Sequence, residues 1–99
     1  MFSHIVIFWT DPARPEAAEK LKAGAEKYLA PIPGILHFHV GRMVRSARPV
    51  VVQSYQVALN VQFVSKKAQD AYQVHPLHLE FIEKVLKPLG PKVMVYDFE

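Results

Sequence analysis

The sequence has 99 residues, which is enough for one domain with a single hydrophobic core and too few for two. Apolar residues make up 51% of the chain and cysteine is absent, so a core is available while disulfides, thiolate zinc sites and a cysteine nucleophile are excluded. The net charge is +3, but the basic residues are scattered and form no stripe with interleaved aromatic residues, so we expect no nucleic-acid partner.

The chain opens with an apolar segment, FSHIVIFW at residues 2–9. Its β-branched and aromatic residues and its short length predict a strand rather than a helix. It lacks a basic flank, and it is too short for the apolar part of a signal peptide or for a membrane span. We therefore expect a cytoplasmic protein with no membrane partner.

A helical pattern follows between residues 10 and 31. Apolar residues recur at three- and four-residue spacing from Ala18 to Leu29, which predicts an amphipathic helix. Either Pro12 or Pro15 suits its first turn. Later prolines end the helix, because proline cannot supply the backbone donor that a helix interior needs.

Two strands are predicted next, at residues 35–44 and 54–63. The second alternates regularly between apolar and polar residues, which is typical of a strand with one buried face. The apolar residues that we expect to point toward the helices are Tyr55, Val57, Leu59, Val61 and Phe63.

Two helical segments and a final strand complete the chain. Ser65 is placed to cap a helix over residues 66–74, and Pro76 begins a second stretch over residues 76–90. Residues 92–98, KVMVYDF, have the composition of a last strand. The order βαββαβ predicts an α+β, ferredoxin-like fold, in which both helices cover one face of a four-stranded antiparallel sheet.

The second face of this sheet is also apolar. A single layer of helices leaves that face bare, and a patch of several large apolar side chains is rarely tolerated by a monomer. Fully burying one such side chain is worth about 1.5–3 kcal/mol. We therefore expect a homodimer whose two sheets pack face to face. The expected interface residues are Ile5, Ile7, Trp9, Met94 and Tyr96.

Several motifs together resemble a known family, the stress-responsive dimeric α/β barrel (Dabb) domain. They are HIVIF in the first strand, IPGI before the second, SYQVALNVQFVSKKAQDAYQVHPLHLEF in the second half, and the closing KVMVYDFE. The segment from Tyr72 to His78, with its HPxH pattern, is the most specific. The resemblance covers essentially the whole chain and implies a ferredoxin-like protomer that pairs with a second copy into an α/β barrel.

The resemblance also bears on activity. Most members of the family have no assigned reaction, whereas a few plant members are polyketide cyclases that close a ring by aldol chemistry with a tyrosine and a histidine. Those two residues match Tyr72 and His78, and the first-strand histidine of the cyclase pocket matches His4. A third-strand histidine of that pocket is replaced by Val57, so the cyclase substrate is not carried over to this chain.

The local pattern around these residues favours acid–base chemistry independently. The residue before a proline is pushed toward extended backbone, so Pro76 should begin a helix with His78 in its first turn. The positive end of a helix disfavours a charged imidazole, and a neutral histidine can accept a proton while a nearby phenol donates one. We expect Tyr72 and His78 to be the catalytic pair. The residues expected to line a small-ligand pocket are His4, Val6, Phe38, Leu59 and His75.

Two alternatives stay open for the same segment. The polar tips of Tyr72 and the histidines can simply satisfy backbone groups where the helix breaks. A metal site is a second alternative, because His75 and His78 have HxxH spacing. No zinc motif of known spacing is met, however, and we expect no metal and no cofactor.

Three hypotheses for the function follow. The first is a stress-responsive Dabb homodimer of unassigned molecular role that binds a small ligand between sheet and helices. The second is a cofactor-independent enzyme of the cyclase or isomerase kind, with Tyr72 and His78 as its acid–base pair; monooxygenase chemistry is a further option by analogy with the fold alone. The third is a structural stress protein whose dimers associate into larger oligomers.

Overall fold

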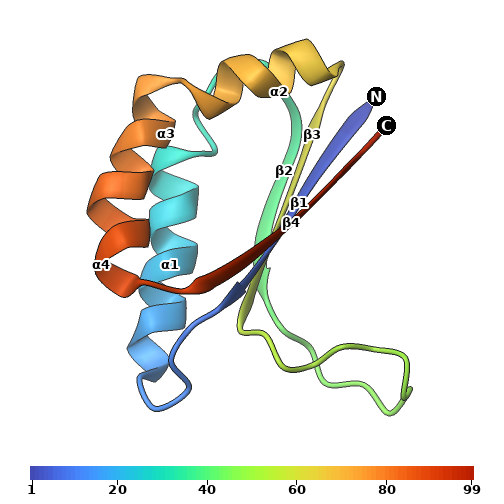
Figure 1. The fold of residues 1–99 in the computed structure, drawn as a ribbon, viewed down its shortest axis with the longest axis vertical. Coiled ribbons are helices and arrows are strands. Elements are labelled where there is room, and N and C mark those ends of the chain that lie inside the picture. Colours follow the sequence, from blue (N-terminus) through green and yellow to red (C-terminus); the bar gives the residue numbers. More distant parts are fainter.

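An antiparallel sheet organises the structure, a computed structural model that describes all residues from 1 to 99. Its four strands lie in the order β2-β3-β1-β4. They are β1 (Phe2–Trp9), β2 (Ile35–Arg42), β3 (Val57–Phe63) and β4 (Lys92–Phe98). The helices form a layer on one face of the sheet (Figure 1), which confirms the predicted ferredoxin-like α+β fold.

The helix layer has two parts. The first is α1 (Pro15–Tyr28), and the second comes from the segment between β3 and β4. That segment begins with α2 (Lys66–Gln73) and continues as a rod made of α3 (Pro76–Phe81), a π-helical turn η1 (Ile82–Leu86) and α4 (Lys87–Leu89). None of these helices combines the length and the apolar character that crossing a bilayer would require.

Prolines and one serine divide the second half of the chain as predicted. The hydroxyl of Ser65 accepts a backbone N–H in the first turn of α2, and Pro76 occupies the first turn of α3.

Pro88 gives a physical reason for the π-helical turn. In a regular α-helix its ring would clash with the carbonyl four residues back, and it has no N–H to donate. The turn is widened instead, and the N–H of Lys87 bonds to the carbonyl of Ile82, five residues back.

The hydrophobic core lies between the helix layer and the sheet. Its largest fully buried side chains are Leu21, Leu29, Val57, Val61, Phe63 and Tyr72. Gly24 lets α1 approach η1 closely, because a Cβ at this position would lie 2.7 Å from both methyl carbons of Val85. The rod therefore packs against α1 at this point.

The predicted alternation of β3 holds from Val57 onward and fails before it. Val57, Leu59, Val61 and Phe63 are buried toward the helices. Tyr55 corrects the prediction, because it lies with Ile7 and Trp9 on the opposite face. Regular pairing of β3 begins at Val57, three residues after the predicted start of the strand. The two-residue alternation therefore does not include Tyr55. β2 likewise ends at Arg42, two residues before the predicted end.

Candidate functional site

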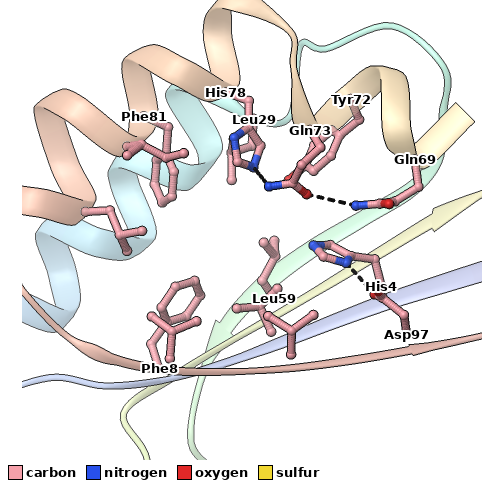
Figure 2. A pocket seen from close by; sticks show the side chains of 15 residues that line it. His4, Phe8, Leu29, Leu59, Gln69, Tyr72, Gln73, His78, Phe81 and Asp97 are labelled. Atoms are coloured by element: carbon pink, nitrogen blue, oxygen red, sulfur yellow. Dashed lines mark hydrogen bonds and ion pairs between the residues drawn. The ribbon is translucent and has the colours of Figure 1, made fainter.

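A cavity of about 380 Å³ lies between the helix layer and the part of the sheet formed by β1 and β4 (Figure 2). Its apolar lining consists of Val6, Phe8, Leu29, Leu59, Phe81, Ile82, Leu86, Val93 and Val95. Its polar lining consists of His4, Gln69, Tyr72, Gln73, His78 and Asp97. The polar groups gather near α2, whereas Phe8 and Phe81 lie toward the other end. The cavity therefore has a polar end and an apolar end.

The break between α2 and α3 brings two of the polar rings together. His75 has extended backbone geometry before Pro76, and its Nδ1 accepts the N–H of Leu77 at 3.1 Å, which caps α3. The chain then re-enters a helix with His78 turned inward. The rings of Tyr72 and His78 meet edge to face, with centroids 4.9 Å apart.

The third ring comes from the first strand. His4 is paired directly with Asp97 across β1 and β4, and Nδ1 of the imidazole lies 2.6 Å from Oδ1 of the carboxylate. The carboxylate accepts a hydrogen bond from Nδ1–H and so fixes the tautomer and the orientation of the ring. The other ring nitrogen, Nε2, is turned into the cavity (Figure 2). The His4 ring lies against Tyr72, with centroids 5.9 Å apart.

Tyr72 carries an unpartnered buried hydroxyl. The residue is 1% exposed, and its phenol oxygen has no hydrogen-bond partner. Burial raises the pKa of the Tyr72 phenol above its ordinary value, so the group stays protonated at neutral pH and is available as a donor. A buried hydroxyl without a partner costs about 1–3 kcal/mol. A ligand oxygen placed beside it would remove that cost.

His78 ends a chain of side-chain hydrogen bonds. Nε2 of Gln69 donates to Oε1 of Gln73 at 2.9 Å, and Nε2 of Gln73 lies 3.3 Å from Nε2 of His78. Burial lowers the pKa of His78, and the positive charge that His4 can carry lowers it further. The neutral imidazole agrees with the sequence-based expectation, but its main cause is burial and not the helix end.

Five of the predicted site residues lie together around the cavity: His4, Val6, Leu59, Tyr72 and His78. No group of three or more histidine, cysteine, aspartate or glutamate side chains that could hold a metal ion is present.

Phe38 and His75 lie outside the cavity, which corrects the expectation that they line it. Phe38 packs against the core, but it stands on β2, at the edge of the sheet farthest from β4. His75 faces the start of α3, where its ring is engaged as the cap. The place of Phe38 does not follow from spacing along the chain, because the position across a sheet depends on strand order. The role of His75 is the alternative in which a histidine satisfies a backbone group at the helix break.

Sequence reasoning missed three polar residues of the cavity: Asp97, Gln69 and Gln73. A signal for Asp97 exists, since antiparallel pairing of the first and last strands places it opposite His4. Gln69 stands three positions before Tyr72 on α2, which puts both on one helix face. The link from Gln73 to His78 crosses the helix break and has no comparable signal in the sequence.

The opposite face of the sheet carries an outer groove of about 330 Å³. It is lined by Ile7, Trp9, Val52, Tyr55, Lys92, Met94 and Tyr96. The indole N–H of Trp9 donates to Ser54 at 3.0 Å. Met94 and Tyr96 are 39% and 53% exposed. Ile5 pairs with Tyr96 across β1 and β4, so all five predicted interface residues share this face.

Fold and cavity together define a ferredoxin-like α+β domain with a ligand-sized space under its helix layer. The chain belongs to the Dabb family, the stress responsive A/B barrel domain, which it matches over residues 2–99. This confirms the family that the sequence motifs indicated. No curated protein matches the chain.

Solved structures share the fold along the full chain. A Dabb-family protein from Mesorhizobium loti is 23% identical with a TM-score of 0.77, covering 99% of this chain and 94% of its own. A protein from Arabidopsis thaliana is 29% identical with a TM-score of 0.76, covering 100% and 94%. A dimeric ferredoxin-like protein of unknown function from Thermobifida fusca is 20% identical with a TM-score of 0.77, covering 98% and 88%.

Proposed function

We propose that the protein binds a small, neutral carbonyl compound in the cavity and moves protons on it by acid–base catalysis. One observation carries this proposal. Three rings that can exchange or donate protons, those of His4, Tyr72 and His78, converge at the polar end of a cavity whose other end is apolar. Such a convergence of titratable groups in a concave apolar site is the usual mark of a catalytic or binding centre.

The lining sets the chemistry of the ligand. No lysine or arginine lines the cavity, and its only carboxylate, that of Asp97, is engaged with His4. An anionic ligand would find no counter-charge, and a cationic one would compete for a carboxylate that is already paired. The phenol of Tyr72 offers a hydrogen bond to a carbonyl oxygen. The apolar end accepts a hydrocarbon tail, which gains about 0.8 kcal/mol for each buried CH₂ group.

The chemistry that fits these groups is enolisation. Tyr72 supplies the acid that stabilises the carbonyl oxygen, and an imidazole of the cavity supplies the base. The sequence predicts His78 for the second role. Isomerisation and ring closure both begin with this step, so the cyclase- or isomerase-type hypothesis is the form of enzyme that the cavity supports.

Nonane-2,4-dione tests the proposal, because it combines two carbonyl groups with an apolar tail. We expect the protein to accelerate keto–enol interconversion, followed by the ultraviolet absorbance of the enol, and Tyr72→Phe to lose most of that acceleration. Acetylacetone is the matched control without the tail and should bind more weakly. Binding of the dione without acceleration would contradict the enzyme and leave a ligand-binding protein.

We further propose that the protein is a homodimer paired through the outer groove. The dimeric relative from Thermobifida fusca supports this, and so does the apolar character of a face that the helices leave uncovered. Trp9, one of its lining residues, offers the large aromatic anchor that stable interfaces favour.

Light scattering after size-exclusion chromatography tests the dimer. The wild type should have twice the mass of one chain, and Ile7→Glu should halve it, because a buried unpaired charge is strongly unfavourable. Lys67→Glu, on the exposed surface of α2, is the matched control and should leave the mass unchanged. A wild type that remains single at micromolar concentration would contradict the dimer.

A further inference from the structure

We propose that His4, held by Asp97, is the group that accepts the proton from the ligand, and that His78 remains a neutral neighbour. This inference rests on the proposed function, since it names the base of the same cavity. The role that the sequence assigns to His78 is thereby moved to a residue on the first strand, and Asp97 becomes its positioning residue.

The two imidazoles differ in what stabilises their charged forms. When Nε2 of His4 takes a proton, the resulting imidazolium is hydrogen-bonded through Nδ1–H to the carboxylate of Asp97 at 2.6 Å. Hydrogen bonds between two charged groups are about twice as strong as neutral ones, and a carboxylate behind an imidazole stabilises the cation without taking its proton. His4 itself is 5% exposed, so little water competes for its ring.

His78 has no such support. Its only side-chain hydrogen-bond partner is the neutral amide of Gln73, and its Nδ1 is buried without a partner. The ionisable groups around the two rings are Asp97 from β4 and Tyr72 from α2, and the carboxylate contacts His4 alone. Burial and a charge on His4 both act against a proton on His78. Of the two imidazoles, only His4 therefore has a carboxylate partner for its protonated form.

The proton transfer can be written atom by atom. The carbonyl oxygen of the ligand accepts a hydrogen bond from the hydroxyl of Tyr72. The adjacent C–H bond breaks, its proton bonds to Nε2 of His4, and its electron pair forms a C=C bond while the π pair of the carbonyl moves to oxygen to give an enolate. The imidazolium then returns the proton to another carbon in an isomerisation, or to the alkoxide formed when the enolate carbon attacks a second carbonyl. No oxidant or further reactant is consumed.

The probe 4-nitrophenol reports on the acceptor directly, because its bound phenolate resembles an enolate and has its own visible absorbance. In a mildly acidic buffer, where most of the free probe is protonated, we expect wild-type protein to bind it and to increase the phenolate band. His4→Gln should lower the bound phenolate fraction about tenfold, the scale of losing one hydrogen bond to a charged group. The matched variant His78→Gln should lower the band clearly less than His4→Gln does, and His39→Gln, on the exposed surface of β2, should leave it unchanged.

Asp97→Asn tests the positioning role. It retains a hydrogen-bonding side chain but removes the charge that supports the imidazolium, so the phenolate band should fall while the shape of the cavity is kept. In ¹⁵N spectra of the histidines, the wild type should show His4 with its proton on Nδ1, and the variant should show a mixture of tautomers. An unchanged phenolate band in Asp97→Asn would contradict the positioning role.

The neutral probe 4-nitroanisole separates failure of this assignment from failure of the cavity. It fills similar space without an acidic proton, so wild type, His4→Gln and His78→Gln should all still bind it, which shows that the cavity of each variant is intact. If the phenolate band is lost in His78→Gln and kept in His4→Gln, or if wild type binds nitrophenol without ionising it, the assignment is overturned and the cavity stands. If neither probe binds the wild type, the proposed function fails and the assignment fails with it.

Discussion

The two halves of the helix-facing side of the sheet differ in how completely the helices fill the space above them. Over β2 and β3, α1 presses apolar residues into a closed core, and Leu21, Ala25, Val57, Val61 and Phe63 are 0% exposed. Over β1 and β4, the helices leave the cavity, and every residue of β4 is exposed. The half over β2 and β3 is therefore filled with apolar side chains. The half over β1 and β4 keeps unfilled space and polar groups without hydrogen-bond partners.

The course of the helical rod explains this difference. α3 and η1 pack closely against α1, where Gly24 lets Val85 approach, and the cavity lies between them and the strands beneath. The rod thus covers β1 and β4 at a distance and is held in place by its contacts with α1. Because the closed half carries the hydrophobic burial, the open half can keep an unfilled volume lined by His4 and Tyr72.

The sharpest test of this division is a pair of matched truncations. Leu21→Ala in the closed half should lower the free energy of unfolding by about 2–5 kcal/mol, because it leaves a new void in a filled core. Leu86→Ala in the wall of the cavity should lower it by less than half as much, since that leucine is only half-buried beside existing space. Denaturant unfolding measures both, and equal losses would contradict the division.

A methyl group at Gly24 should disturb the packing of the helical rod against α1. Gly24→Ala improves helix propensity by about 1 kcal/mol, yet the added Cβ meets both methyl carbons of Val85. Overpacking of this kind costs about 1–3 kcal/mol, so we expect a net loss of stability and a lower thermal midpoint. In the double variant with Val85→Ala, most of that loss should be recovered. A rise of the midpoint in the single variant would contradict the close contact.

Acid should weaken the open half through His78. The pKa of this residue is lowered in the folded protein, so the unfolded chain takes up the proton first as the pH falls. Its contribution to stability is complete above about pH 6.5 and is lost as the pH drops from there toward the lowered pKa, by at most about 1.4 kcal/mol per pH unit. His78→Gln should flatten this part of the curve of unfolding free energy against pH, whereas the exposed control His39→Gln should not.

The smallest effect has the opposite sign. Tyr72→Phe removes a buried hydroxyl without a partner, so we expect the protein to become more stable by about 1 kcal/mol while it loses activity toward the dione. Tyr28→Phe, at a half-buried position outside the cavity, is the matched control and should change neither property. A loss of stability in Tyr72→Phe would show that the hydroxyl has a structural partner.

Local patterns in the sequence predicted the elements well where the physics is local. The alternation of apolar and polar residues in β3, the cap at Ser65 and the helix start at Pro76 all depend on neighbours within a few positions, and the structure has each of them. The prediction failed for Tyr55, because the end of a strand is set by its partner strand. It failed for Phe38 because strand order placed this residue far from the cavity.

By itself, the sequence determined the βαββαβ order, the apolar character of both sheet faces and the gathering of Tyr72 and His78 around a helix break. Only the tertiary structure placed Asp97 against His4, 93 positions away, and only it left a cavity between the helical rod and the sheet. The reason is physical: periodicity and proline act through the local backbone, whereas hydrogen bonds between distant strands and unfilled space depend on how whole elements pack.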